Sequence, residues 1–220
     1  MKRILLLHGY TEAGSIFDPL RPLLPPAAEV VVPELEQEFA QWPCGPRLTV
    51  ATMARHLAAR YHIGPHDVLI GHSMGGWLAA HIKEQTGATA ILLGGFTDQA
   101  KIVSSIRHPL LLKLYALSGL VQSNFMSQRF KRNYRRDESR ELYAQLVDRM
   151  PHFRRRYVQQ QLQLLFAPVP PLTTEPDLRL HARRDNIIRP PDEPFTELPG
   201  DHFTHYFYPQ LVVDAIRPYL

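Results

Sequence analysis

The stretch V-L-I-G-H-S-M-G-G-W-L-A-A, residues 68–80, decides the fold of this chain. The three apolar residues before Gly71 are typical of a short buried strand, and the apolar, alanine-rich run after Gly75 is typical of a helix. Between them, the pattern G-x-S-x-G sets Ser73 at the apex of a tight turn. The sequence therefore predicts a strand, a sharp turn and a helix, with the serine hydroxyl raised above the end of the strand.

The two glycines of this pattern have a steric explanation. At such a turn the serine backbone is strained, and side chains two residues away on either side would crowd the strand and the helix. The turn also places Ser73 at a helix N-terminus, where unbonded backbone N–H groups favour a developing negative charge. A serine that only caps an ordinary strand-to-helix turn is the alternative, but it leaves Gly71 and Gly75 unexplained. We therefore expect Ser73 to be a nucleophile.

Length and composition indicate an ordinary globular chain. The 220 residues suit one domain with room for an insertion, and hydrophobic and charged contents are 45% and 21%. Cys44 is the only cysteine, which excludes an internal disulfide and fits a reducing compartment. The apolar run 4–7 is too short for the core of a signal peptide, and no stretch approaches the roughly 20 apolar residues of a membrane span. We expect a cytoplasmic protein without a membrane span.

The net charge is +4, and the excess of Lys and Arg falls in residues 96–166. A basic segment could attract anionic substrates, nucleic acid or a membrane surface. Here, however, the arginines alternate with apolar positions at helical spacing, and no nucleic-acid-binding motif accompanies them. We interpret the segment as surface helices with solvated arginine faces and expect no nucleic-acid partner.

Strand and helix patterns alternate along the rest of the chain, without the turn signals of β-hairpins. This alternation predicts an α/β fold, a mostly parallel sheet of about six strands with helices on both faces. The predicted strands are residues 4–7, 30–32, 68–72, 90–93, 177–182 and 195–198. The predicted helices are residues 15–24, 49–61, 74–86 and 208–219. Residues 34–47 lack a helical period and are expected to form a surface loop.

The strand pattern stops in residues 96–176, where the sequence predicts helices instead. We expect residues 1–95 and 177–220 to form the core, and residues 96–176 to form a helical cap over the cleft. The alternative is an accessory segment that only covers the sheet edge. The predicted cap helices are residues 109–117, 123–134, 138–150 and 151–166. Five apolar side chains either line a pocket or form the cap's own core: Leu110, Leu114, Phe125, Phe130 and Phe153.

A serine hydroxyl needs a base within hydrogen-bond reach to become a nucleophile, and the base needs a carboxylate to fix its tautomer. Asp185 follows the predicted strand 177–182, and His202 lies in the turn after the strand 195–198. Because the carboxyl ends of parallel strands share one edge of the sheet, both side chains are expected near Ser73. We therefore predict Asp185 as the acid and His202 as the base.

Rival candidates remain for both roles. Asp98 follows the preceding predicted strand and is an alternative acid, and His205 is an alternative base that lies toward the last helix. Asp201 adjoins the base and is expected to point away, and His72 is expected to be a packed, hydrogen-bonded histidine. The remaining histidines show no metal-ligand spacing, so we predict no metal site and no cofactor.

The dipeptide His8-Gly9 ends the first predicted strand. A glycine there lets the backbone bend and point an N–H into the cleft. Together with the N–H of the residue after the nucleophile, it can bind an oxyanion. We predict the backbone amides of Tyr10 and Met74 as these two donors. A plain strand-ending turn is the alternative.

Four ordered motifs resemble the α/β-hydrolase family, in particular its small bacterial-type serine esterases: H-G at 8–9, G-H-S-M-G-G at 71–76, H-A-R-R-D at 181–185 and P-G-D-H-F at 199–203. The resemblance spans the chain apart from residues 96–176. It implies a catalytic triad and an oxyanion hole, with the roles of nucleophile, acid, base and two amide donors falling on Ser73, Asp185, His202, Tyr10 and Met74.

The sequence departs from the family's pattern in two places. The chain begins at the strand before His8-Gly9, so we expect the family's first two antiparallel strands to be missing. Only residues 186–194 separate Asp185 from the next predicted strand, which is too few for the crossover helix of a parallel connection. We therefore expect a short last strand or a degenerate turn before it.

The resemblance implies a serine hydrolase that cleaves small carboxylic esters through an acyl-enzyme. A serine at position 73 argues against dehalogenase chemistry, which in this fold uses a carboxylate nucleophile. Thioesters, lactones and activated C–C bonds are alternative substrates, because the pocket selects among them while the triad stays the same. A binding or receptor protein that keeps the fold without turnover is the non-enzymatic alternative. The expected partner is a small-molecule ester or acyl compound, and the oligomeric state is left open.

Overall fold

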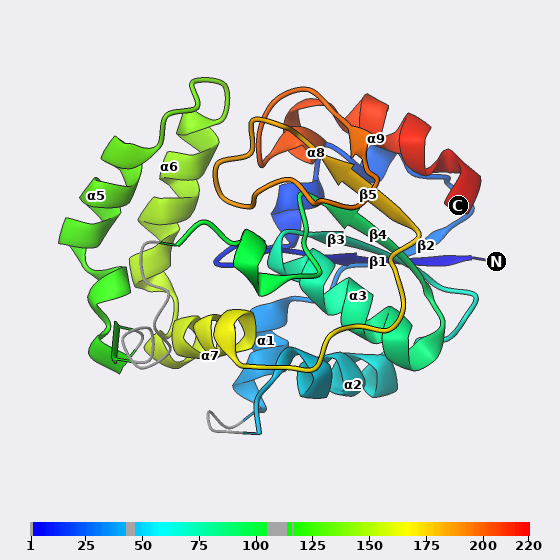
Figure 1. Cartoon of the computed structure of the whole chain (residues 1–220), viewed down its shortest axis with the longest axis horizontal. Coiled ribbons are helices and arrows are strands. Elements are labelled where there is room, and N and C mark those ends of the chain that lie inside the picture. The colour runs from blue at the N-terminus through cyan, green and yellow to red at the C-terminus, as the bar shows by residue number, and fades with distance from the viewer. Residues whose placement is uncertain (1, 43–46, 105–113, 116) are drawn as a thin grey trace.

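A computed structural model describes residues 2–42, 47–104, 114–115 and 117–220 (Figure 1). Six strands form one sheet in the order β2-β1-β3-β4-β5-β6, and each neighbouring pair is parallel. The strands are β1 (Arg3–Leu7), β2 (Glu29–Val31), β3 (Val68–His72), β4 (Thr89–Leu93), β5 (Leu178–His181) and β6 (Thr196–Glu197). The predicted α/β fold, with a mostly parallel sheet of about six strands, is confirmed.

Alternate side chains of the strands bury into two apolar clusters, one on each face of the sheet. On β1, Leu5 and Leu7 join one cluster, and Ile4 and Leu6 join the other. All four side chains are fully buried. Burial of such a side chain contributes about 1.5–3 kcal/mol to folding, so an apolar run that faces both clusters fixes β1 at the centre of the molecule.

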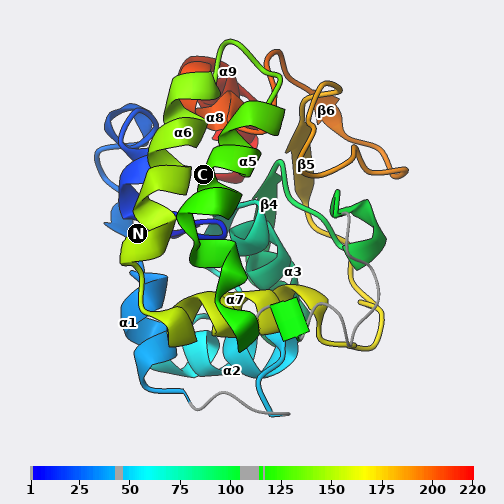
Figure 2. The same cartoon turned by 90° about the vertical axis from the view of Figure 1, so that its left-hand side faces the viewer.

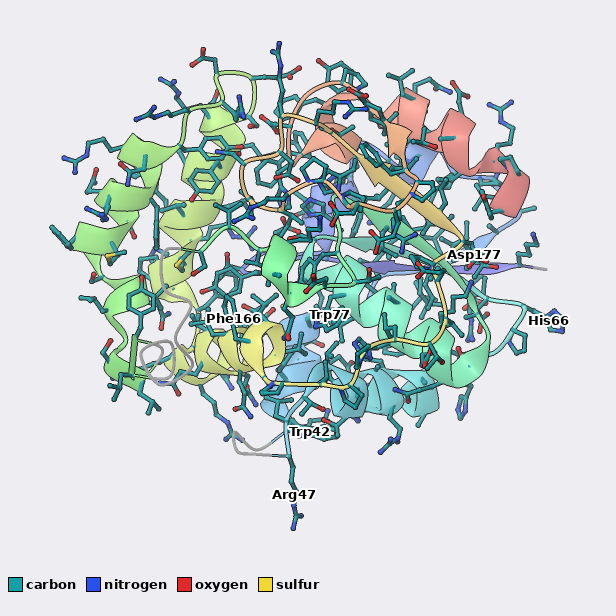
Figure 3. All side chains as sticks on the ribbon, viewed as in Figure 1. Trp42, Arg47, His66, Trp77, Phe166 and Asp177 are labelled. Carbon is teal, nitrogen blue, oxygen red and sulfur yellow. The ribbon has the colours of Figure 1, made fainter. Side chains whose placement is uncertain are left out.

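Helices cover both faces of the sheet (Figure 1). The first face carries α1 (Leu35–Ala40), α2 (Val50–Arg60), α3 (Met74–Thr86) and α7 (Arg155–Phe166). The second carries α8 (Thr204–Phe207), α9 (Pro209–Ile216) and the 3-10 helices η1 (Gly14–Phe17) and η2 (Arg21–Leu23). Trp77 of α3 lies inside the first layer, whereas Arg47 and His66 point away from the body (Figure 3).

Two further helices, α5 (Asn124–Asn133) and α6 (Arg140–Arg149), stand at the end of the sheet where the strands finish (Figures 1 and 2). The described residues of this segment also form the 3-10 helices η3 (Gln99–Lys101), η4 (Leu120–Gln122) and η5 (Met150–His152). α7 buries Tyr157, Leu164 and Leu165 in the cluster beneath the sheet. The segment 96–176 thus combines helices over the sheet edge with one that packs into the core, and its division from the core stays a prediction.

Two expectations for the first half of the chain are wrong. The predicted helix 15–24 is replaced by η1 and η2, because Pro19 and Pro22 lack the backbone N–H groups that a continuous helix requires. The predicted loop 34–47 contains α1, in which Leu35 and Phe39, one turn apart, are both fully buried. A helix of six residues is too short to show a clear period in the sequence.

In the second half, helix starts differ most from expectation. Pro151 lies in η5, and α7 begins only at Arg155. α6 begins after Ser139 and not after Asp137. The predicted helix 109–117, which includes Leu110, lies largely outside the described residues.

The end of the chain behaves as the short connection predicts. β6 has two residues and follows β5 through residues 182–195, which form no helix. The last predicted helix is divided into α8, α9 and η6 (Arg217–Tyr219). Pro209 starts α9, as expected of a residue whose fixed φ suits a first helical turn.

Candidate active site

Ser73 stands between β3 and α3 with φ 53° and ψ −117°, a conformation that residues with a side chain rarely adopt. Its neighbouring glycines make the turn sterically possible. A Cβ on Gly71 would lie 2.2 Å from the Gly75 carbonyl oxygen, and a Cβ on Gly75 would lie 1.9 Å from the Leu7 carbonyl oxygen. The turn therefore requires both glycines, and it sets α3 directly against the end of β1.

His202 and Asp185 form a buried hydrogen-bonded pair. His202 Nδ1 lies 2.7 Å from Asp185 Oδ2, and Asp185 Oδ1 accepts hydrogen bonds from the amides of Ile187 (2.8 Å) and Ile188 (2.9 Å). Burial alone would raise the pKa of the Asp185 carboxyl, but the His202 and His181 imidazoles hold it below its ordinary value. An ionised carboxylate accepts the Nδ1–H, which leaves the other nitrogen of His202 able to take up a proton.

The end of β4 connects this pair with Ser73. The Ser73 amide donates to the Leu93 carbonyl at 3.0 Å. A Cβ on the next residue, Gly94, would lie 3.4 Å from His202 Nδ1 and 3.5 Å from Asp185 Oδ2. In the described part of the chain, neither Ser73 Oγ nor His202 Nε2 makes a hydrogen bond. The structure therefore places the three predicted side chains at one edge of the sheet, where Ser73 Oγ and His202 Nε2 have no hydrogen-bond partner among the described residues, each other included.

The rival acid and base have different surroundings. Asp98 is exposed and accepts a hydrogen bond from the Ala100 amide at 2.8 Å. His205 lies in α8 with its ring centroid 4.0 Å from that of His72, and neither of its ring nitrogens has a partner among the described residues. Of the two predicted acids, it is Asp185 that reaches a histidine in this structure.

The loop after β1 runs beside the elbow. A Cβ on Gly9 would lie 3.1 Å from the Cβ of Ser73. The Gly9 amide donates to Glu12 Oε2 at 2.6 Å, so it is already occupied. The amides of Tyr10 and Met74, the predicted oxyanion donors, donate no hydrogen bond within the ranges that the structure describes. Two unoccupied amides near a serine hydroxyl can receive a negatively charged oxygen.

A second buried pair, Glu12 and His72, lies behind the elbow, and sequence reasoning missed its acidic member. Glu12 Oε2 lies 2.9 Å from His72 Nδ1, and His72 Nε2 lies 3.0 Å from the His202 carbonyl oxygen. The expectation that His72 is packed and hydrogen-bonded agrees with these contacts. For Glu12, the available signal is its position three residues after Gly9, where a carboxylate can accept that amide.

Side chains from the helical segment hold both loops of the site. The Ser139 hydroxyl donates to the Asp201 carboxylate next to His202, and Tyr134 contacts the same hydroxyl at 2.7 Å. Gln161 Oε1 of α7 accepts the Thr11 amide at 3.2 Å. Asp201 thus points away from the base, toward the helices, as its sequence position predicts. These contacts tie the loop after β1 and the loop of the base to residues 96–176.

A small apolar cluster lies within the helical segment. It contains Val121, Met150 and Val158, and Phe130, Phe153 and Tyr10 pack against it. Of the other predicted pocket residues, Leu114 and Phe125 are exposed at the surface. Among the described residues, no group of three or more His, Cys, Asp or Glu is arranged to hold a metal ion. Across the same ranges, no helix combines the length and apolar character that a membrane span requires.

Comparisons with known proteins agree with this architecture. A thermophilic esterase from Thermogutta terrifontis is similar in structure, with a TM-score of 0.72 and 21% identity, over 100% of this chain and 89% of that chain. A hydrolase from Oleispira antarctica has a TM-score of 0.72 and 12% identity, over 99% and 91%. The enol-lactonase from Burkholderia xenovorans has a TM-score of 0.68 and 15% identity, over 98% and 91%. At these identities the likeness shows the fold.

Sequence comparison gives the family. No curated protein matches the sequence. The sequence model described as the alpha/beta hydrolase family, however, matches residues 4–215, which is nearly the whole chain. The parallel sheet and the strained serine between β3 and α3 are the structural counterparts of that match. This chain therefore belongs to the alpha/beta hydrolase family.

Proposed function

We propose that the protein is a serine hydrolase that cleaves small carboxylic esters through an acyl-enzyme on Ser73. The observation that carries the proposal is the buried His202–Asp185 contact of 2.7 Å beside the strained serine elbow. A packing role does not explain why Ser73 holds a positive φ, since such strain persists only where the surrounding structure enforces it. Family membership and esterase neighbours with the same fold support a hydrolase.

In the first half of the reaction, Ser73 Oγ attacks the carbonyl carbon of the ester while His202 Nε2 takes the hydroxyl proton. Asp185 stabilises the imidazolium that forms, because its carboxylate already accepts the opposite N–H of the ring. When the tetrahedral intermediate collapses, His202 returns the proton to the leaving alcohol. The acyl group stays on Ser73 as an ester.

In the second half, a water molecule replaces the alcohol. His202 takes a proton from this water, which attacks the acyl carbonyl, and the second intermediate collapses to release the carboxylic acid. The proton then returns from His202 to Ser73 Oγ. In the second half water is the nucleophile and Ser73 is the leaving group, while His202 again acts first as base and then as acid, so the free enzyme is regenerated.

The negative oxygen of both intermediates is assigned to the amides of Tyr10 and Met74. Their lack of acceptors in the described chain, and the Gly9–Ser73 approach, support this assignment. Met74 begins α3, so its amide also lies at the positive end of a helix dipole. In serine hydrolases one such donor contributes roughly 10²- to 10³-fold to turnover.

The helices of residues 96–176 are assigned the role of a cap. α5 and α6 stand over the edge where the strands end (Figure 2). Tyr10 packs against the small apolar cluster of Val121, Met150 and Val158. A cap in this place would exclude water from the acyl-enzyme and shape the pocket for the acyl or alcohol group. The triad does not choose between oxygen esters, thioesters and lactones, so this pocket sets the preferred substrate.

A fluorophosphonate probe tests the proposal, because it modifies a serine only when a base activates it. We expect the wild type and the exposed-serine control Ser15→Ala to gain one adduct, mapped to the Ser73 peptide, and Ser73→Ala to gain none. Substrate class follows from p-nitrophenyl esters of rising acyl length, with acyl-CoA thioesters and lactones alongside. A folded wild type that is neither labelled nor active would contradict the proposal and favour a binding protein.

A further inference from the structure

Glu12 and His72 form a buried pair that the proposed reaction does not use. Glu12 keeps 4% of its surface exposed and His72 keeps none. One carboxylate oxygen, Glu12 Oε2, contacts both the Gly9 amide at 2.6 Å and His72 Nδ1 at 2.9 Å. The opposite ring nitrogen, His72 Nε2, lies 3.0 Å from the His202 carbonyl oxygen.

These contacts fix the number of protons on His72. A backbone carbonyl can only accept, so Nε2 must carry a hydrogen. Glu12 Oε2 already accepts the Gly9 amide, which favours an ionised carboxylate. An ionised carboxylate can only accept, so Nδ1 then carries a hydrogen as well. An imidazole with hydrogens on both nitrogens is an imidazolium. The geometry therefore corresponds to a buried ion pair, which is costly unless its groups are hydrogen-bonded. Here both ring nitrogens of His72 and the Oε2 of Glu12 have partners.

The charged and titratable groups around His72 agree with this state. Burial would raise the pKa of Glu12 and lower that of His72, but their mutual attraction reverses both, so the pKa of Glu12 is lowered and that of His72 is raised. His202 and Asp185, the proposed base and acid, lie near the His72 ring. The ring of His205 from α8 packs at a tilt against that of His72. Burial lowers the pKa of His205 well below the ordinary value, so it faces His72 as a neutral group.

The pair joins three segments that meet only at the site. Glu12 lies in the loop after β1, and His72 is the last residue of β3. The carbonyl that His72 Nε2 contacts is that of His202, the proposed base. Because Ser73 follows His72 directly, the same ion pair bridges the nucleophile, the base and the loop of the Tyr10 amide. A displacement of about 1 Å at such a site can cost roughly 100-fold in rate.

We propose that Glu12 and His72 are positioning residues for this reaction: an ion pair that holds the backbone of His202 and the Gly9–Tyr10 turn in register with Ser73. This role rests on the proposed serine hydrolase function. Neither side chain needs to touch the substrate. What the pair supplies is a fixed Nε2–H donor to the His202 carbonyl, because a charged His72 keeps that hydrogen while its Nδ1–H is held by Glu12.

Glu12→Gln tests the pair, because one amide atom cannot both accept the Gly9 amide and balance a charged His72. A neutral His72 then has a hydrogen on one ring nitrogen only, so it loses either the contact with residue 12 or the donor to the His202 carbonyl. We expect kcat and the rate of fluorophosphonate labelling to fall roughly 10- to 100-fold, with KM nearly unchanged. Glu34→Gln is the matched control: Glu34 lies 3.9 Å from His8 and accepts the Gly14 amide, but it does not touch His202. It should leave both rates unchanged.

The ring nitrogens of His72 give a second readout that needs no turnover. In ¹H–¹⁵N spectra of wild-type protein at pH 8, where an ordinary histidine is neutral, His72 should show hydrogens on both nitrogens. A neutral His72 at pH 8 overturns the ion pair, even if Glu12→Gln fails to fold. An active wild type whose Glu12→Gln variant keeps kcat overturns the positioning role alone. An inert, unlabelled wild type overturns the proposed function, and the positioning role with it.

Discussion

Two buried carboxylate–histidine pairs lie within one site, and the second ring nitrogen of the histidine has a different environment in each. In Asp185–His202 and Glu12–His72 the Nδ1 contacts are 2.7 Å and 2.9 Å long. His202 Nε2 has no partner in the described chain, whereas His72 Nε2 contacts the carbonyl of His202. The two pairs contain the same types of group, but His202 Nε2 can exchange a proton, whereas His72 Nε2 must keep its proton to bond the carbonyl.

The comparison also shows that the neighbours of a histidine, more than its burial, decide whether it can act as a base. His202 and His72 are both almost fully buried, and so is His205, whose nitrogens have no partners among the described residues. The His72 ring lies against both of the others, with its centroid 4.7 Å from that of His202 and 4.0 Å from that of His205. A free nitrogen qualifies as a base only where a carboxylate fixes the other one and a nucleophile lies beside it.

The largest expected effect on kcat distinguishes His202 from His205. His202→Gln should lower kcat for a p-nitrophenyl ester by about 10⁴-fold or more, because the proton of Ser73 then has no acceptor. The same change at His205 should cost less than about tenfold, since that ring only packs against its neighbours. Steady-state kinetics on both variants decides the matter. A greater loss at His205 would reverse the roles.

The next effect concerns the acid. Asp185→Asn should lower kcat by about 10³- to 10⁴-fold, because the amide no longer holds His202 in the tautomer that a base requires. Asp98→Asn removes the rival acid, which is exposed and caps η3, and should leave kcat within about twofold. Equal losses in the two variants would mean that the carboxylate partner of the base changes when substrate binds.

A smaller effect tests the link between the base loop and the helical segment. Ser139→Ala removes the donor to the buried Asp201 carboxylate, and we expect a loss of about 1–3 kcal/mol in the free energy of unfolding. Ser127→Ala is the control, since that buried hydroxyl has no partner in the described residues. Urea titration measures both. A Ser139 variant as stable as the control would show that the contact contributes little.

The smallest effect is a pH dependence of stability. Glu12 raises the pKa of His72, although burial opposes it, so between about pH 6.5 and that raised pKa the folded state holds a proton that the unfolded state has lost. The stabilisation is complete below the unfolded pKa and disappears as pH rises through the folded one. The difference in unfolding free energy between wild type and His72→Gln should therefore shrink toward alkaline pH. A constant difference from pH 6 to 9 would contradict a charged His72.

Strong local signals made the elbow predictable from sequence. The predicted helix 74–86 has the bounds of α3, because the glycine–serine pattern fixes its start and Gly87, in the left-handed conformation, ends it. β3 and β4 follow from apolar runs next to turn residues. The order of Ser73, Asp185 and His202 along a parallel sheet then indicated where three distant side chains would meet.

The rest depended on contacts that leave no local trace. Glu12 and His72 are 60 positions apart, and nothing around Glu12 marks it as the partner of a histidine. Ser139 and Asp201 are 62 apart, and the direction of the Ser139 hydroxyl depends on how the helices rest on the sheet. Polar pairs of this kind are set by tertiary packing, whereas periodicity reports only which face of an element is buried.

Acylation of Ser73 is measured most directly as the mass of the protein during turnover of a p-nitrophenyl ester, quenched by acid within the first cycles. We expect a covalent acyl group on the Ser73 peptide of the wild type. The same adduct should form at least about 10³-fold more slowly in His202→Gln, and not at all in Ser73→Ala. Hydrolysis that proceeds at the wild-type rate in Ser73→Ala, or an acyl group found on another residue, would contradict the proposed role of Ser73.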